Sequence, residues 1–480
     1  MSITPDLRHK TDESVHIADS VVRGFAEFAT TLDHEDLTEA ALRAAKRCLI
    51  DALGCALGAQ GMDAIVAIQS VAATATSTRP ARLIGTTTAT TPDLAAFVNG
   101  TAIRSLDFND DYFGTDESNA RGDNGPHPSD NIGAVLACAQ MVGADGGTAL
   151  LGTVLAYEVS GQLVDEVVLR SNGWDYTIFH AIASATAGAR LLGLGLDATA
   201  NAIRMAAVAN LSVFESRAGA LSNWKGMAGP NGSRNGLFAA ILAEAGITGP
   251  EKAFEGRLGL MRQINHRFAL GPFGGPTRPF RIEHTYFKHL PLRYELQLPV
   301  EVATSVRETI DLAEIDRVQV YLERKSVTSR DKEPELWRPT THETADHSGP
   351  YLIAHALVHG GIDAAAFTPE RLADRAVWRV MDAIELIEDP AYTAMFPWTM
   401  ACRFEITLRD GRTVTVHGEN PKGHPRNTLS DGEIEDKFLR QASPRIGDRQ
   451  AADVLDLVWN LEREASLDRL FDLMVGTNNE

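Results

Sequence analysis

The amino-acid sequence predicts a mainly α protein in which a large all-helical domain is formed by both ends of the chain and carries a smaller α+β domain. Ala- and Leu-rich helical patterns dominate from Ser14 to about Leu270, and alternating apolar and polar residues occur only in the second half. A helical pattern then returns near the end of the chain. This order predicts boundaries at 1–275, 276–428 and 429–480, with the last segment rejoining the first domain.

Length and charge limit the possible functions. The 480 residues, 44% hydrophobic and 23% charged, are enough for two domains of unequal size. A net charge of −19 without a visible basic patch argues against a nucleic-acid or anionic-lipid partner. Apolar runs are interrupted before they reach the roughly 18 residues of a membrane span. The first fourteen residues predict an irregular start rather than a signal peptide, so we expect a soluble cytoplasmic protein.

The cysteine pattern predicts buried thiols in a reducing compartment. Cys48, Cys55, Cys138 and Cys402 are widely scattered and match neither a disulfide framework nor a zinc or iron–sulfur spacing. The cysteines therefore predict no zinc or iron–sulfur centre, and we expect no bound cofactor.

The first domain is predicted from helical stripes. Asp36 is placed to cap a helix in which five apolar residues share a face: Leu37, Ala41, Ala44, Cys48 and Leu49. Similar stripes recur from Ile132 to Leu163 and from Ala181 to Leu211. Because Ala and Gly are abundant on these faces, we expect closely packed helices, some of them buried on all sides.

A Gly/Pro-rich stretch at 271–276 marks the start of the second domain. One strand is predicted at Val318 to Leu322, and a hairpin at 402–416 with its turn at Asp410-Gly411. Helical periodicity lies between them, over 350–360 and 368–387.

The tail is predicted to be helical again. Ser430 and Glu433 form a plausible capping box, and helical periodicity extends from there to Met474.

The richest cluster of polar residues lies in a predicted irregular segment before the helix at Ile132. Asp107, Asp110, Asp111 and His127 occur there among glycines and prolines. Crowded carboxylates raise one another's pKa, so one of them could hold or remove a proton near neutral pH, and the cluster could also bind a cation.

The alternative is structural. Asp107 and Asp111 could cap turns, and Ser129 or Asp130 could cap the following helix.

Two further segments are open to more than one interpretation. His180 follows an aromatic run at the start of a small-residue helix, where a single histidine is more often structural than catalytic. The Gly-rich stretch 222–236 contains Lys225 but lacks the order of a nucleotide-binding loop. Its backbone N–H groups and Lys225 could cradle carboxylates at a helix N-terminus, or the stretch could be a flexible surface turn.

Six ordered motifs resemble the 2-methylcitrate dehydratase (MmgE/PrpD) family, which includes cis-aconitate decarboxylases. They are Asp-Phe-Asn-Asp at 107–110, His-Pro-Ser-Asp-Asn at 127–131, Trp-Lys-Gly at 224–226, Phe-Lys-His-Leu-Pro at 287–291, Glu-Thr-Ala-Asp-His-Ser at 343–348 and Asn-Pro-Lys-Gly-His-Pro at 420–425. The resemblance extends over nearly the whole chain. It implies a helical domain built from both chain ends, an α+β lid, a cleft between them and a homodimer.

The resemblance also implies the site residues. The family's catalytic positions fall on Asp107, His127, His180 and Lys225. Substrate contacts are predicted for Asp111, Ser129, Lys288 and Arg293, the last of these from the lid.

Three departures from the family pattern predict a reshaped pocket. Asp111 stands where relatives commonly have Thr, and Arg293 stands where His or Glu is frequent. The linker from Tyr112 to Pro126 is also longer than expected.

The resemblance implies a metal-independent hydro-lyase acting on a small di- or tricarboxylate such as 2-methylcitrate. Asp107, His127 and His180 would divide the proton transfers, while Lys225 and Arg293 would bind carboxylates and stabilise an enolate-like transition state. Decarboxylation of a cis-aconitate-type acid and epimerisation of a dicarboxylate need the same stabilised carbanion and remain alternatives. A non-catalytic carboxylate-binding protein is a further alternative.

Overall fold

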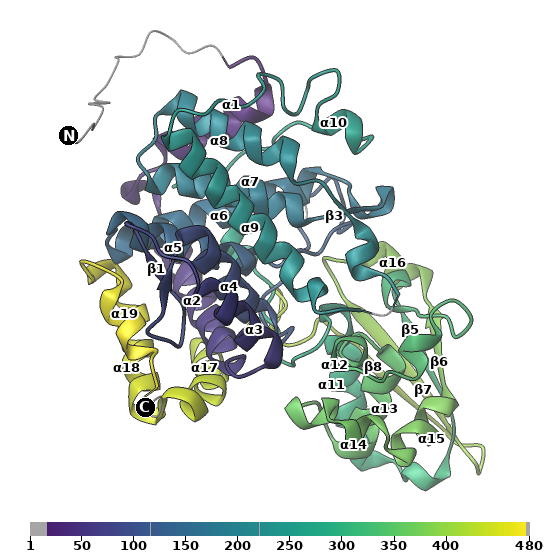
Figure 1. Ribbon diagram of the computed structural model, residues 1–480. Coiled ribbons are helices and arrows are strands. Elements are labelled where there is room, and N and C mark those ends of the chain that lie inside the picture. Colours follow the sequence, from purple (N-terminus) through teal and green to yellow (C-terminus); the bar gives the residue numbers. More distant parts are fainter. Residues whose placement is uncertain (1–16, 116, 220, 477–480) are drawn as a thin grey trace, which may run out of the picture.

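The computed structural model describes residues 17–115, 117–219 and 221–476, and the irregular start predicted for residues 1–14 lies outside them. The chain forms a large helical body and a smaller α+β lid (Figure 1), so the predicted mainly α fold is confirmed. The body contains α1 Ser20–Thr31, α2 Glu39–Gly58, α3 Asp63–Ala72, α4 Pro92–Arg104, α5 Ile132–Val142, α6 Gly146–Glu166, α7 Thr177–Leu191, α8 Leu196–Ala209, α9 Trp224–Glu244, α10 Leu260–Gln263, α17 Asp431–Ile446, α18 Asp448–Trp459 and α19 Asp468–Leu473. Two-residue strands pair as β1 Ala81–Arg82 with β2 Ala89–Thr90, and β3 Trp174–Asp175 with β4 Ser212–Val213.

Helix α7 lies at the centre of the body against α6, α8 and α9. Small residues allow this close packing, because a Cβ added at Gly232 would lie 2.4 Å from Thr177 O and one at Gly236 would lie 2.2 Å from Ala181 O. Nearly every residue of α7 is buried, as expected for a helix with apolar residues on all sides.

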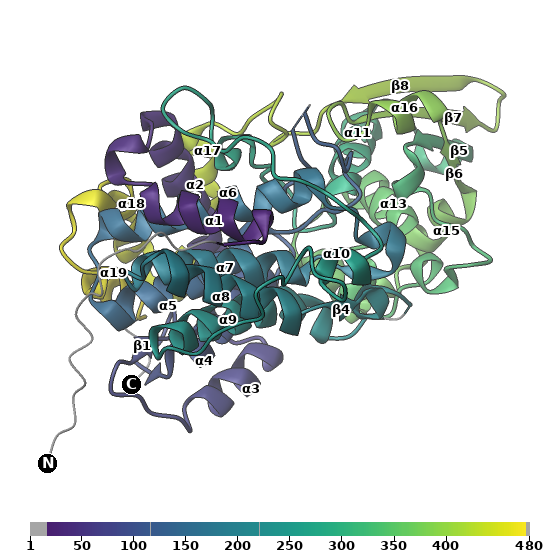
Figure 2. The ribbon, with the colours of Figure 1, turned by 90° about the horizontal axis from the view of Figure 1, so that it is seen from above.

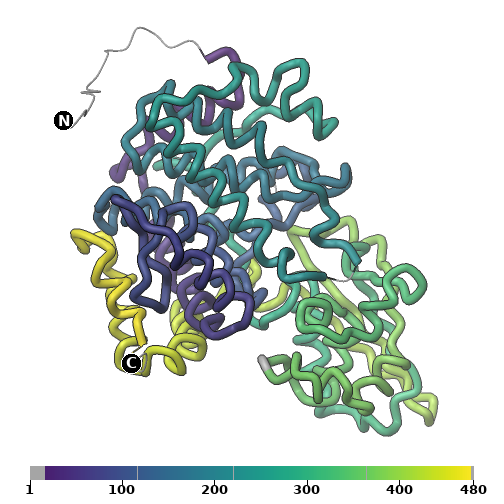
Figure 3. Tube along the Cα trace, viewed as in Figure 1, coloured from purple at the N-terminus to yellow at the C-terminus, as the bar shows by residue number. Residues whose placement is uncertain are grey.

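The C-terminal tail packs against the N-terminal half of the body (Figure 3). Helix α17 contacts α2 so closely that a Cβ at Gly54 would lie 3.1 Å from Phe438 Cα. Ser430 begins α17 with the predicted capping box to Glu433. Lys437 is buried and forms an ion pair with Asp51, with 2.5 Å between Nζ and Oδ1.

The lid is built around a four-stranded sheet of order β6-β5-β7-β8. Strand β5 pairs parallel with β6 and antiparallel with β7, and the β7–β8 hairpin is the predicted one. Helices α11, α13 and α15 contact the sheet and lie on one side of it (Figure 2). The lid elements are α11 Gln297–Val306, β5 Ile315–Leu322, α12 His342–Ala345, α13 Gly349–His359, α14 Pro369–Leu372, α15 Arg375–Ala383, β6 Ile384–Glu388, α16 Pro390–Met395, β7 Ala401–Leu408 and β8 Thr413–Glu419.

Two local predictions were wrong, and one of two open alternatives is excluded. The helix predicted to reach residue 387 ends at Ala383, because the next five residues alternate in burial and pair with β5 as strand β6. Asp36 does not cap α2, since Thr38 is its N-cap and accepts a hydrogen bond from Ala41 N. The Gly-rich segment is no surface turn, because α9 already begins at Trp224 and uses these glycines to approach α7.

Two large hydrophobic cores and a small cluster of alanines from α7, α8 and α9 lie in the described residues. The first draws on residues 17–287 together with 429–474, and the second on Phe113 and residues 286–408. The domain boundaries themselves stay a prediction.

All four cysteines are free and buried. In the described part of the chain no single helix has the length and apolar composition of a membrane span, and α2 with α3 reach them only as a pair bent by 98°.

Candidate active site

A cavity of about 430 Å³ lies between the body and the lid and receives side chains from both. Its lining is locally cationic, although the protein has a net charge of −19. The described lining includes five acidic residues and eight lysines or arginines, the latter being Arg104, Arg170, Arg217, Lys225, Lys288, Arg293, Lys325 and Lys332.

Asp107 is the anionic centre of the cavity. It follows α4 in a turn and adopts a left-handed φ of 46°. Lys288 Nζ lies 2.9 Å from its Oδ1, Lys225 Nζ lies 3.5 Å from its Oδ2, and Arg104 donates to Oδ1. Burial alone would raise the pKa of Asp107, but Lys225, Lys288 and Arg104 hold that pKa well below its usual value. Asp107 is therefore ionised and positions three cations.

The two lysines differ in how strongly their charge is stabilised. Burial lowers the pKa of Lys225, and Asp107 offsets this only in part. Burial also acts on Lys288, but Asp107 and Asp111 raise the pKa of Lys288 above its ordinary value. Lys225 stands in the first turn of α9. Neighbouring carboxylates stabilise its charge less than they stabilise that of Lys288, so Lys225 is the better placed of the two to bind a further anion.

The surroundings of Asp111 favour its protonated form. Its backbone pairs with Tyr286, which fixes the side chain in the cavity wall 3.4 Å from Lys288 Nζ. Burial raises the pKa of Asp111 well above the usual value, and Asp107 adds to this against the opposing charge of Lys288. The crowded carboxylates thus separate into one ionised and one protonated group.

His127 is a neutral base with a fixed tautomer. Its Nδ1 lies 2.6 Å from the carbonyl oxygen of Asp110. A carbonyl oxygen only accepts, so Nδ1 carries the hydrogen and Nε2 has a free lone pair. Burial, together with the charges of Arg104 and Lys288, lowers the pKa of His127 well below its usual value. The imidazole is therefore unprotonated near neutral pH.

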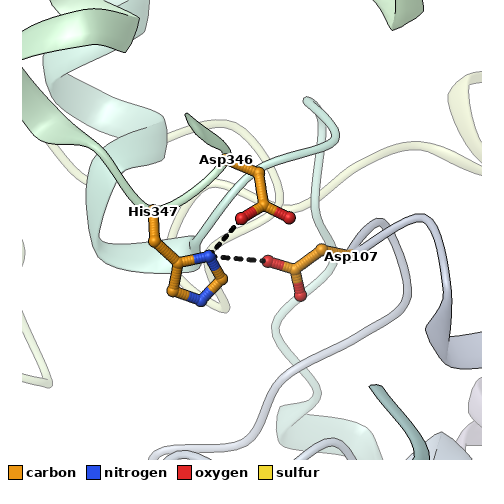
Figure 4. Close-up of side chains that lie close together, drawn as sticks. All are labelled: Asp107, Asp346 and His347. Atoms are coloured by element: carbon orange, nitrogen blue, oxygen red, sulfur yellow. Dashed lines mark hydrogen bonds and ion pairs between the residues drawn. The ribbon is translucent and has the colours of Figure 1, made fainter. Parts of the chain in front are cut away.

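The lid contributes Asp346 and His347, which the sequence interpretation did not assign a role. His347 Nδ1 hydrogen-bonds to Asp346 and lies 3.9 Å from Asp107 Oδ2 (Figure 4). Burial and Lys225 lower the pKa of His347. The sequence contained a sign of their importance, because both residues belong to the motif 343–348 on which the family resemblance partly rests.

Asp107, Asp346 and His347 offer ligand atoms within 4.8 Å of one another, the spacing of a metal site. A lysine ammonium already forms ion pairs with these carboxylates, because Lys225 Nζ lies 3.5 Å from Asp107 Oδ2 and 3.9 Å from Asp346 Oδ2. A divalent cation would lie against this ammonium, and their repulsion disfavours metal binding here.

Arg293 lines the cavity as predicted, but its guanidinium is already engaged. It forms two hydrogen bonds with Glu295, at 3.0 and 3.1 Å. Although burial raises the pKa of Glu295, Arg293 lowers it to about 2. Arg170, by contrast, has no carboxylate within ion-pair distance among the described residues and lies over the Phe214 ring at 5.1 Å. Only the tertiary structure brings Arg170 to the cavity.

Two predicted site residues are not among the described residues that line the cavity. His180 is fully buried in α7, where Nδ1 lies 3.1 Å from Asn131 Nδ2 and Nε2 lies 3.6 Å from Asp130 Oδ2. Burial lowers its pKa to about 3. Ser129 is also buried and binds Asn109 and Asp110. Their functional roles stay predictions.

Asp130 does not cap the helix at Ile132, because neither of its carboxylate oxygens accepts a hydrogen bond in the described structure. Burial raises its pKa to about 7.

Comparison with known proteins agrees with this architecture over nearly the whole chain. The MmgE/PrpD N-terminal domain matches residues 23–271, and the MmgE/PrpD C-terminal domain matches residues 291–463.

Relatives of similar length carry two kinds of name. A 2-methylcitrate dehydratase of Salmonella typhimurium is 28% identical, covering 89% of this chain and 91% of the relative. One of Escherichia coli strain K12 is 27% identical, covering 91% and 92%. A human cis-aconitate decarboxylase is 25% identical, covering 95% of each chain. With both family domains matched in order around one shared cavity, the chain belongs to the MmgE/PrpD family.

Proposed function

We propose that this protein is a metal-independent hydro-lyase that removes water from a small di- or tricarboxylate such as 2-methylcitrate. The observation that carries the proposal is the pairing, in one cavity, of a neutral His127 with the cations Lys225, Lys288 and Arg104 around an ionised Asp107. Elimination from a β-hydroxy acid needs a base beside a carboxylate and positive charge where the enolate forms. The names of the relatives support the same class of reaction.

Substrate carboxylates have three suitable partners. Lys225 offers an ammonium that Asp107 neutralises only in part, and Arg170 offers a guanidinium without a carboxylate partner among the described residues. The protonated Asp111 can donate a hydrogen bond to a carboxylate without electrostatic repulsion. Acids with two or more carboxylates match this set better than monocarboxylates.

Proton removal is assigned to His127. Its Nε2 would accept the proton on the carbon beside a carboxylate, and Asp110 O would keep the ring oriented through Nδ1–H. The negative charge would then spread onto that carboxylate, where Lys225 stabilises it. Asp107 stays ionised throughout and acts as a positioning residue for the cations.

The same arrangement supports metal independence. A lysine ammonium provides the charge that a divalent ion provides in other hydro-lyases, and it lies between the carboxylates that would bind such an ion.

Proton NMR of chelator-treated enzyme in deuterated buffer tests the proposal. We expect an olefinic product from 2-methylcitrate or citrate, with activity unchanged by chelator. Loss of carbon dioxide from cis-aconitate would indicate a decarboxylase instead, and deuterium exchange without net product would indicate an epimerase. Activity that needs an added divalent ion would contradict metal independence.

Asp111→Asn is expected to keep kcat/KM within about threefold of the wild-type value, because an amide and a protonated carboxyl both donate a hydrogen bond. Asp107→Asn in the same loop is the matched comparison. It should lose more than about 100-fold, since it leaves three cations without their shared anion.

Steady-state kinetics against pH extend this test. A carboxyl with a raised pKa keeps its proton to a higher pH than a free carboxyl does. Wild-type kcat/KM should therefore fall at high pH, and the fall should be weaker in Asp111→Asn. A loss above about 30-fold at neutral pH in this variant would mean that Asp111 works as a carboxylate.

A further inference from the structure

His180 was predicted as a site residue, but Tyr176 is the residue from this segment that lines the cavity. It immediately precedes α7 and lies one helical turn before His180, so the two side chains point to the same side of the helix. Its ring contacts both histidines edge-to-face, with centroid distances of 5.6 Å to His180 and 6.3 Å to His127. Tyr176 lines the cavity and His180 does not. Tyr176 therefore separates the buried histidine from the substrate space.

The Tyr176 hydroxyl is open to the cavity. It forms no hydrogen bond with any described residue, yet it is not among the buried polar atoms that lack a partner. Tyr294, which lines the same cavity, differs because its hydroxyl is sealed from solvent.

The positive charges of Arg217 and Arg104 act on Tyr176. Arg217 Cζ lies 4.2 Å from the centre of the ring, and Arg217 is itself held by Asp175. Burial raises the pKa of Tyr176, and the charges of Arg217 and Arg104 oppose this rise. The phenol is therefore protonated at neutral pH, and two guanidinium groups stabilise the phenolate that forms when it gives up a proton.

We propose that the Tyr176 hydroxyl is the acid that protonates the leaving hydroxide during elimination. This inference rests on the proposed function. It adds the general acid, which the mechanism needs besides the base His127 and the cations. His127 Nε2 takes the proton from the α-carbon, and the C–H electron pair becomes the second bond of the alkene. The C–O bond breaks with its electron pair on oxygen, which takes the Tyr176 proton and leaves as water. The proton on His127 then returns to the phenolate through solvent.

A change of leaving group tests this role. Fluoride leaves without needing a proton, so Tyr176→Phe should lower kcat for the hydroxy acid about 100-fold and leave turnover of the matching β-fluoro acid within about threefold of wild type. KM for both should change little. Tyr294→Phe is the control and should behave as wild type with both substrates, because the Tyr294 hydroxyl is inaccessible to solvent and forms no hydrogen bond with a described residue.

The outcomes separate the two proposals. Equal slowing of both substrates in Tyr176→Phe, or unchanged kcat for the hydroxy acid, would overturn the role of Tyr176 and leave the hydro-lyase function standing. Wild-type enzyme that acts on neither the hydroxy acid nor the fluoro acid would overturn the proposed function itself. Retained deuterium exchange at the α-carbon in Tyr176→Phe, with elimination lost, would support both.

Discussion

Replacement of Lys225 by methionine is expected to lower kcat/KM for the hydroxy acid about 1000-fold, which corresponds to about 4 kcal/mol of transition-state stabilisation. Methionine keeps most of the side-chain volume and removes the charge that would face the developing enolate. The fold should tolerate the change, because Asp107 keeps Lys288 and Arg104 as partners. Steady-state kinetics together with thermal unfolding check both statements.

Lys332→Met is the matched control. Lys332 lines the same cavity but is exposed and has no ion pair with a described residue. Its loss should change kcat/KM by less than about threefold. If Lys225→Met cost less than about tenfold, the charge of Lys225 would not act on the transition state and the proposed centre of the site would be misplaced.

His127→Asn is expected to lower kcat about 1000-fold with a small effect on KM. The Asn side-chain amide can still donate to Asp110 O, so the local structure is retained while the basic nitrogen is lost. Deuterium exchange at the α-carbon should disappear with it. Because the pKa of His127 is lowered, wild-type kcat should be constant through neutral pH and fall only in acid, where the imidazole takes a proton.

His180→Asn provides the contrast. Its side chain is sealed behind Tyr176, so exchange should persist and the change should appear mainly as a lower thermal stability. If deuterium exchange were lost in His180→Asn and retained in His127→Asn, His180 and not His127 would be the base.

Sequence patterns predicted those elements whose structure depends on interactions between residues close together in the chain. The β7–β8 hairpin has a short turn between alternating residues, and the capping box at Ser430 satisfies its own helix. Strand β6 was missed because its partner β5 lies more than sixty residues earlier in the chain and pairs with it in parallel. Five residues directly after an amphipathic helix carry too little periodicity to reveal such a partner.

The site was predicted where chemistry is encoded in neighbouring residues. The crowded carboxylates indicated that one of them could hold or remove a proton, and the pKa of Asp111 is raised, mainly by burial and further by Asp107. Two features of the site depend on geometry that the sequence does not encode. A shift of one helical turn separates His180 from Tyr176, and Arg293 reaches the cavity already paired with Glu295.

The support of the Asp107 loop by Lys437 has a consequence for biosynthesis. The Lys437 ammonium donates to the carbonyl oxygens of Phe108 and Lys288, at 2.6 and 3.0 Å, and thus ties the catalytic loop to α17. A ribosome delivers this lysine only after both the body helices and the whole lid have emerged. The nascent chain therefore cannot acquire activity step by step, and a shortened product that stops before α17 would carry every proposed catalytic residue and still be inactive.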